Sequence, residues 1–295
     1  MTTTSPQHPL TQDPTHMRTH TVRGAGDVLL HVREWGPHGG TPIVLIHGIS
    51  QSHQCWTRQY DSSLVDEFRL VAYDLRGHGM SEAPADAASY TDERMWADDL
   101  AAVVDHLGLE QPVLVGWSYG AFVIGDYLRV HGQDNVAALN FAAGAVRLGH
   151  AAFGTLIGPG FVDHFADLVS DDLPTSIRGL RGLIDGFATQ PLSPDDRETL
   201  LCASMVVPAA IRAHLGARDL NYDDVLRHLR VPLLVSQGRA DTIVLPAMAQ
   251  HMLDICPTAE ASWYDDVSHT PFLEHADRFN QELASLARRT RRTRR

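Results

Sequence analysis

A serine flanked by glycines stands where an apolar run gives way to a helical pattern. Residues 116–120 read Gly-Trp-Ser-Tyr-Gly, after the apolar run Pro112–Val115 and before Ala121–Ile124. This placement predicts a sharp strand-to-helix turn, in which side chains two positions before and after the serine would collide, so that glycine is needed at both. The strained turn directs the central hydroxyl out of the sheet edge. The pattern therefore predicts Ser118 as a nucleophile.

A serine hydroxyl is a weak nucleophile at neutral pH, so it needs a base within hydrogen-bond reach and a third group to orient that base. Both types of residue follow later in the chain. Asp241 comes just after the apolar run Val231–Ser236, and His269 lies between the run Ala261–Tyr264 and the last helical pattern. The order Ser118, Asp241, His269 is the chain order of one of the known serine triads.

Other residues compete for these roles. The chain has 17 histidines, and only position in a loop before the final helix favours His269. His47 is expected to hold a loop by hydrogen bonds, and His53 lacks a suitable position. Asp265 and Asp266 are close to the histidine in sequence, but they belong to the end of the same strand and would have to fold back on it. Asp241 is therefore the expected orienting acid.

The elements around these residues alternate between short apolar strands and amphipathic helices. Most strands are bounded by Gly or Pro, as strands buried on both faces are. The alternation predicts an α/β fold with a mostly parallel sheet and helices on both faces. The expected strands are 27–35, 42–47, 69–73, 112–115, 136–141, 231–236 and 261–264, and the expected helices are 92–107, 119–131, 246–255 and 271–287.

One stretch breaks this alternation. Residues 147–217 contain no clear strand, and phenylalanine, leucine and isoleucine recur there at near-helical spacing. We expect a helical cap that buries its apolar face over the C-terminal edge of the sheet. The predicted organisation is then a disordered segment 1–18, a core of 19–146 and 218–287, the cap 147–217, and an arginine-rich tail 288–295.

Composition limits the classes of partner. The formal net charge is −12, although six of the last eight residues are arginine, so the rest of the chain is more acidic still. An acidic body disfavours nucleic acid or an anionic membrane as the main partner. No apolar run suits a membrane span or a secretory signal, which favours a cytoplasmic protein. The expected partner is a small-molecule substrate, and assembly into a homo-oligomer is left open. Cys55, Cys202 and Cys256 have no disulfide or zinc spacing, and without any lysine there is no Schiff-base chemistry.

From about Thr19 to Ala287 the chain resembles the α/β-hydrolase family. Besides the serine turn, His47-Gly48 resembles its oxyanion loop, and residues 74–81, Asp-Leu-Arg-Gly-His-Gly-Met-Ser, resemble its D-x-R-G-x-G-x-S segment. The resemblance implies an eight-stranded sheet and a Ser-His-Asp triad. It also implies that the backbone N–H groups of Ile49 and Tyr119 hold the oxyanion of the reaction, where donors of this kind stabilise developing charge.

A serine at this turn argues against epoxide opening and halide displacement, for which members of the family use aspartate. We expect hydrolysis of a small or medium, largely apolar carboxylic ester or lactone through an acyl-enzyme, with no metal and no organic cofactor. Trp117, Phe153 and Ile157 are candidate substrate contacts. The alternatives are a C–C bond hydrolase, an amidase, a lyase or a perhydrolase on the same triad, and a ligand receptor without catalysis.

Overall fold

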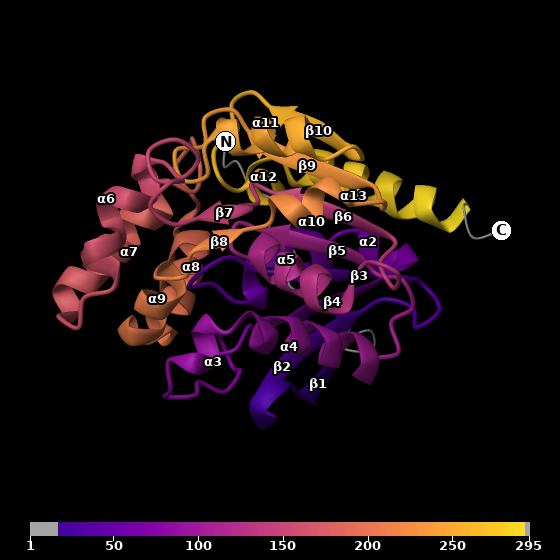
Figure 1. Ribbon diagram of the computed structural model, residues 1–295, viewed down its shortest axis with the longest axis horizontal. Coiled ribbons are helices and arrows are strands. Elements are labelled where there is room, and N and C mark those ends of the chain that lie inside the picture. The colour runs from indigo at the N-terminus through magenta and orange to yellow at the C-terminus, as the bar shows by residue number, and fades with distance from the viewer. Residues whose placement is uncertain (1–16, 293–295) are drawn as a thin grey trace, which may run out of the picture.

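A computed structural model describes residues 17–292, with side chains as far as residue 290 (Figure 1). Its centre is an eight-stranded sheet in the order β1-β2-β4-β3-β5-β6-β9-β10. The pairs β1–β2 and β2–β4 are antiparallel, and all the others are parallel. The strands are β1 Met17–Arg23, β2 Leu29–Trp35, β3 Thr41–Ile46, β4 Phe68–Tyr73, β5 Val113–Trp117, β6 Ala138–Ala142, β9 Leu233–Gly238 and β10 Ala259–Tyr264. The predicted α/β fold with a mostly parallel eight-stranded sheet is confirmed.

The central strands are buried on both faces, which explains why they read as continuous apolar runs. Every residue of β4, β5 and β6 is buried, and β3 is buried from Pro42 onward. Seven expected strands lie within two residues of the observed bounds. The strand β1 is not among the expected strands, and residues 17 and 18, which the sequence predicts to be disordered, begin it. Only Val22 of this edge strand is buried, so it lacks the apolar run of its neighbours; residues 1–16 lie outside the described part of the chain.

Helices cover both faces of the sheet (Figure 1). The helix α5 packs against β3 and β5 and against α4, while α13 contacts β3 and β6 from the other face. The expected helix 271–287 is two helices, because the backbone leaves the helical region at His275. The helices of the core are α1 Thr57–Tyr60, α2 Leu64–Glu67, α3 Ala88–Thr91, α4 Glu93–His106, α5 Gly120–His131, α10 Asp223–Arg227, α11 Pro246–Ile255, α12 Pro271–Glu274 and α13 Ala276–Arg292, with 3₁₀ turns η2 Ala25–Asp27 and η3 His53–Trp56.

Four further helices lie beside one another beyond one end of the sheet (Figure 1). They are α6 Pro159–Leu168, α7 Leu173–Asp185, α8 Pro194–Val206 and α9 Ala209–Gly216. The chain enters this cap through β7, Arg147–Leu148, and leaves it through β8, Leu220–Asn221, which pair antiparallel. Within residues 17–292 no single helix has the length and apolar content to cross a membrane; α8 and α9 reach them only together, with an 88° bend between them.

The arginine-rich end is not a separate tail as far as the structure describes it. The helix α13 continues to Arg292, five residues beyond the expected end of the core. Arg288 donates to the carboxylate of Glu67, with Nε at 3.0 Å from one oxygen, and its guanidinium lies over the ring of Phe68. These contacts hold the first residues of the arginine run against the core. Residues 293–295 lie outside the described part.

Candidate active site

The turn at Ser118 has the strained geometry that the sequence predicts. Ser118 follows β5 directly and has φ +52°, in the left-handed region that non-glycine residues rarely adopt. A Cβ on Gly116 would lie 2.7 Å from the carbonyl carbon of Gly120, and one on Gly120 would lie 2.3 Å from the backbone oxygen of Ile46. Both glycines are therefore required by close backbone contacts, and the turn presents the serine side chain at the C-terminal end of β5.

The structure brings His269 and Asp241 together. The ring Nδ1 of His269 lies 2.8 Å from Oδ2 of Asp241, which fixes the proton on Nδ1 and leaves Nε2 as the basic nitrogen. The other carboxylate oxygen accepts the backbone N–H groups of Ile243 and Val244 at 2.8 and 3.0 Å. The side-chain amide of Gln237 also donates to Oδ2 at 3.1 Å, and these four donors together orient the carboxylate toward the ring.

Two loops must approach closely for this pair to form. A Cβ on Gly238 would lie 2.0 Å from the backbone oxygen of Ser268, so only glycine fits where the loop of the acid meets the loop of the histidine. The indole N–H of Trp117 donates to the backbone oxygen of His269 at 3.0 Å and ties the histidine loop to β5. The competing Asp265 is exposed and binds Arg239 instead.

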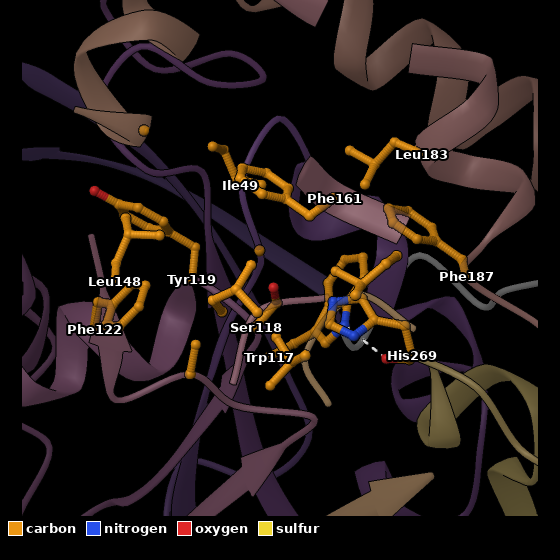
Figure 2. Close-up of a pocket in the computed structure, with 16 residues that line it drawn as sticks. Ile49, Trp117, Ser118, Tyr119, Phe122, Leu148, Phe161, Leu183, Phe187 and His269 are labelled. Carbon is orange, nitrogen blue, oxygen red and sulfur yellow. Dashed lines mark hydrogen bonds between the residues drawn. The ribbon is translucent and has the colours of Figure 1, made fainter. Parts of the chain in front are cut away.

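Ser118 and His269 face one apolar pocket between the sheet and the cap (Figure 2). Its empty volume is about 520 Å³, including the part open to solvent. The other lining residues carry no charge, and most are apolar: Gly48, Ile49, Trp117, Tyr119, Phe122, Ala145, Leu148, Ile157, Phe161, Leu183, Phe187, Gly216, Ile243 and Val244. Among the described residues no hydrogen bond joins Ser118 Oγ to the histidine, and such pairs are often loose without substrate.

Of the three candidate substrate contacts, two lie at this pocket and one does not. Trp117 and Ile157 line the pocket, whereas Phe153 does not: it is half-buried, forms a β-bridge with Ile157 and packs against the hydrophobic core. The cap supplies Phe161, Leu183 and Phe187 instead. Their helical spacing identified the buried face of the cap, but the sequence holds no signal for which of these residues reach the pocket.

The two proposed oxyanion donors also border this pocket. Ile49 and Tyr119 line it beside Ser118, and neither backbone N–H donates to a partner within residues 17–292. Both groups are therefore free to bind a substrate oxygen.

Two buried histidines fix the loop that carries Ile49. Nδ1–H of His47 donates to the oxygen of Gly48 at 2.8 Å, and its Nε2 accepts the N–H of Leu75 at 3.0 Å. Nε2 of His78 accepts the N–H of Ser50 at 3.2 Å. Burial lowers the pKa of His47 to about 4 and that of His78 to about 3. Both rings are therefore neutral at pH 7, and His47 holds the loop as expected.

Within the described part of the chain, one cluster has side chains close enough together for a metal ion, namely His31, His53 and Asp74. Its atoms are already used: Asp74 accepts the ring and backbone N–H groups of His53, each at 2.8 Å, and Nε of Arg33 lies 3.1 Å from Nε2 of His31. A neighbouring guanidinium opposes a cation. The cluster supports the loop 74–81 and offers no ready set of ligands.

The comparisons with known proteins agree with this fold. A model of the alpha/beta hydrolase family matches residues 43–282. The bifunctional esterase/perhydrolase of Acinetobacter calcoaceticus is 38% identical over 270 residues, 87% of this chain and 95% of the relative. Among solved structures, a putative aryl esterase from Burkholderia cenocepacia has a TM-score of 0.88 and 32% identity over 92% of this chain and 99% of the other. The esterase RhEst1 from Rhodococcus sp. ECU1013 has a TM-score of 0.86 and 33% identity, over 91% and 98%. The chain belongs to the alpha/beta hydrolase family, among its esterase-like members.

Proposed function

We propose that this protein is a serine carboxylesterase that hydrolyses small or medium, largely apolar esters or lactones. One observation carries the proposal: Ser118 and His269 meet at one apolar pocket, with Asp241 hydrogen-bonded behind the histidine. Relatives named esterases, at 32% and 33% identity, support ester hydrolysis as the reaction class.

The reaction follows from the roles of these groups. Nε2 of His269 takes the proton of Ser118 as the hydroxyl oxygen attacks the ester carbonyl carbon. The carbonyl oxygen becomes an oxyanion, held by the N–H groups of Ile49 and Tyr119. The histidine then gives its proton to the leaving alcohol, and an acyl-enzyme remains. Water attacks the acyl group with the same histidine as base, which releases the acid and restores the serine.

The pocket favours neutral substrates with apolar groups. Among the described residues, His269 and the buried phenol of Tyr119 are the only ionisable groups that line it, so a charged acyl group would be desolvated without a partner. Walls from both the core and the cap surround Ser118, with Phe122 and Leu148 on one side and Leu183 and Phe187 on the other (Figure 2). This arrangement suits an ester with an apolar group on each side of the carbonyl. A lactone fits the same geometry, with both groups in one ring.

A series of p-nitrophenyl esters of increasing chain length tests the proposal, together with labelling by a fluorophosphonate. We expect hydrolysis that falls to background in Ser118→Ala, and covalent labelling at Ser118 in the wild type only. The matched control is Ser63→Ala, because this serine is exposed and caps no helix with its side chain. Full activity in Ser118→Ala, or a label on another residue, would contradict the proposed mechanism.

A second activity is favoured by one finding. The relative from Acinetobacter calcoaceticus, 38% identical, is named a bifunctional esterase/perhydrolase. With hydrogen peroxide in place of water as the nucleophile, the same acyl-enzyme would release a peracid and the free serine. Formation of peracid from an ester and peroxide, lost in Ser118→Ala, is the expected result; ester hydrolysis without peracid would leave esterase activity alone.

A further inference from the structure

A buried ion pair connects the end of the cap to the helix that follows the nucleophile. Nη2 of Arg218 donates to both carboxylate oxygens of Asp126 at 2.9 Å each, and the hydroxyl of Tyr222 donates to the same carboxylate. The side chains of the pair are 2% and 0% exposed. Removing two charges from water costs about as much as their attraction supplies, so net stability is a weak reason for such a pair.

The position of Arg218 joins three parts of the molecule. It lies between the end of α9 and the start of β8, where the chain returns from the cap to the core. Its partner Asp126 belongs to α5, which begins at the serine turn. Its remaining terminal nitrogen, Nη1, donates to the hydroxyl of Tyr119 at 3.2 Å. One guanidinium therefore contacts both the helix after the nucleophile and the residue directly after Ser118.

Tyr119 extends from the pocket to the buried ion pair. Its backbone N–H borders the pocket beside Ser118, and its hydroxyl lies on the side away from the serine (Figure 2). The ring between them makes edge contacts with Trp96 and Phe122, at centroid distances of 5.8 and 5.3 Å. The guanidinium of Arg218 also lies 5.7 Å from the ring centre of Trp96. A shift of the cation would therefore move the tyrosine side chain, and with it the backbone at the turn.

We propose that Arg218 is a positioning residue, which holds Tyr119 through its hydroxyl so that the backbone N–H of Tyr119 points at the oxyanion. The proposal rests on the proposed serine chemistry. In this proposal the segment between α9 and β8, where the chain returns from the cap to the core, supports the oxyanion site. Because donors must lie within about 3 Å of the developing charge, a small displacement of the N–H group destabilises the transition state more than it destabilises the bound substrate.

Two substitutions distinguish a role of Arg218 in positioning Tyr119 from a role in folding alone. Tyr119→Phe removes only the hydroxyl that Arg218 holds and keeps the ring contacts. Arg218→Lys keeps the charge near Asp126 but loses the planar fork that reaches both partners. The matched control is Arg129→Lys, since Arg129 lies over the ring of Tyr222 on the more exposed side of the same network, and it contacts neither Tyr119 nor the pocket.

Three quantities are measured for each variant: kcat and KM for a p-nitrophenyl ester, the Ki of a trifluoromethyl ketone, and the rate of fluorophosphonate labelling at Ser118. Loss of a whole oxyanion donor lowers kcat about 10²–10³-fold, so a displaced donor should lower it about tenfold. We expect about tenfold losses in kcat, in ketone affinity and in labelling rate for Tyr119→Phe and Arg218→Lys, with KM unchanged. The double variant should be no worse than Arg218→Lys alone, because both act through one contact.

The outcomes distinguish the two proposals. If the wild type hydrolyses no ester yet is labelled at Ser118, the proposed substrate is wrong, and labelling rates still test Arg218. If it is neither active nor labelled, both proposals are overturned. If folded Tyr119→Phe keeps the wild-type kcat, ketone affinity and labelling rate, Arg218 does not act through the tyrosine, and this holds even where Arg218→Lys fails to fold. Additive losses in the double variant would equally refute the proposal.

Discussion

The stability of this protein should fall as the pH is lowered from 6.5 toward 4, because His47 is buried in its neutral form. Its pKa is about 4 in the folded protein against 6.5 for an ordinary histidine. Below pH 6.5 the unfolded chain takes up a proton that the folded protein refuses. The contribution of His47 is therefore fully present above pH 6.5, and it is lost progressively until both states are protonated below pH 4.

The size of this loss follows from the two pKa values. With 6.5 for the unfolded chain and about 4 for the folded protein, linkage gives a loss of about 2 kcal/mol at pH 5 relative to pH 8. The limit, below pH 4, is about 3 kcal/mol. His78, with a pKa of about 3, acts in the same direction. These losses are large against the total stability of a typical domain.

Urea unfolding of wild type and His47→Gln at pH values between 8 and 4.5 measures this term. Glutamine can keep part of the hydrogen bonding but does not titrate, so the variant is expected to be less stable at pH 8 and to lose about 2 kcal/mol less by pH 5. His150→Gln is the control, because this histidine is exposed, and its curve should run parallel to that of the wild type. Parallel curves for His47→Gln and wild type would refute the assigned protonation state.

Three further predictions concern the site. Asp241→Asn should lower kcat by about 10⁴, as an amide cannot hold the required histidine tautomer, while Asp265→Asn, at an exposed ion pair, should keep full activity in the same ester assay. Gly238→Ala should lower the free energy of unfolding by at least about 1–3 kcal/mol, whereas Gly39→Ala, with open space around its Cα, should not; equal melting temperatures would contradict the close approach. Leu183→Ala should raise kcat/KM for long acyl esters relative to short ones about tenfold, and an unchanged ratio would place the acyl chain elsewhere.

The central strands and the three candidate triad residues were predictable because simple rules govern them. Parallel strands buried on both faces produce apolar runs, and the ends of such strands meet at one edge of the sheet. Loops after β5, β9 and β10 therefore had to bring Ser118, Asp241 and His269 to the same edge. The sequence could not predict the close approach of Gly238 to the backbone of Ser268, because it depends on how two loops that are distant in the chain pack together.

The errors have physical causes as well. The strand β1 carries one buried residue among polar neighbours, so no apolar pattern marks it. The sequence predicts a separate arginine-rich tail from residue 288, but α13 continues to Arg292, and Glu67, far away in sequence, pairs with Arg288. The sequence does not distinguish Phe153 from Phe161 as a pocket residue, and only the packing of the cap places Phe161 in the pocket lining and leaves Phe153 out of it.

The chain has no lysine, and in the cap one buried arginine makes contacts that a lysine could not make. Arg212 is buried, and its guanidinium donates to the backbone oxygens of Leu168, Ser204 and Val207 and to the hydroxyl of Ser176. These partners belong to the ends of α6 and α8 and to α7, so one side chain of α9 joins all four cap helices. No described carboxylate pairs with it, and the negative ends of α6 and α8 compensate the charge instead. An ammonium group has three donors without a planar fork, so lysine could not make these contacts. The wall of the pocket formed by the cap therefore depends on a cation that does not itself line the pocket.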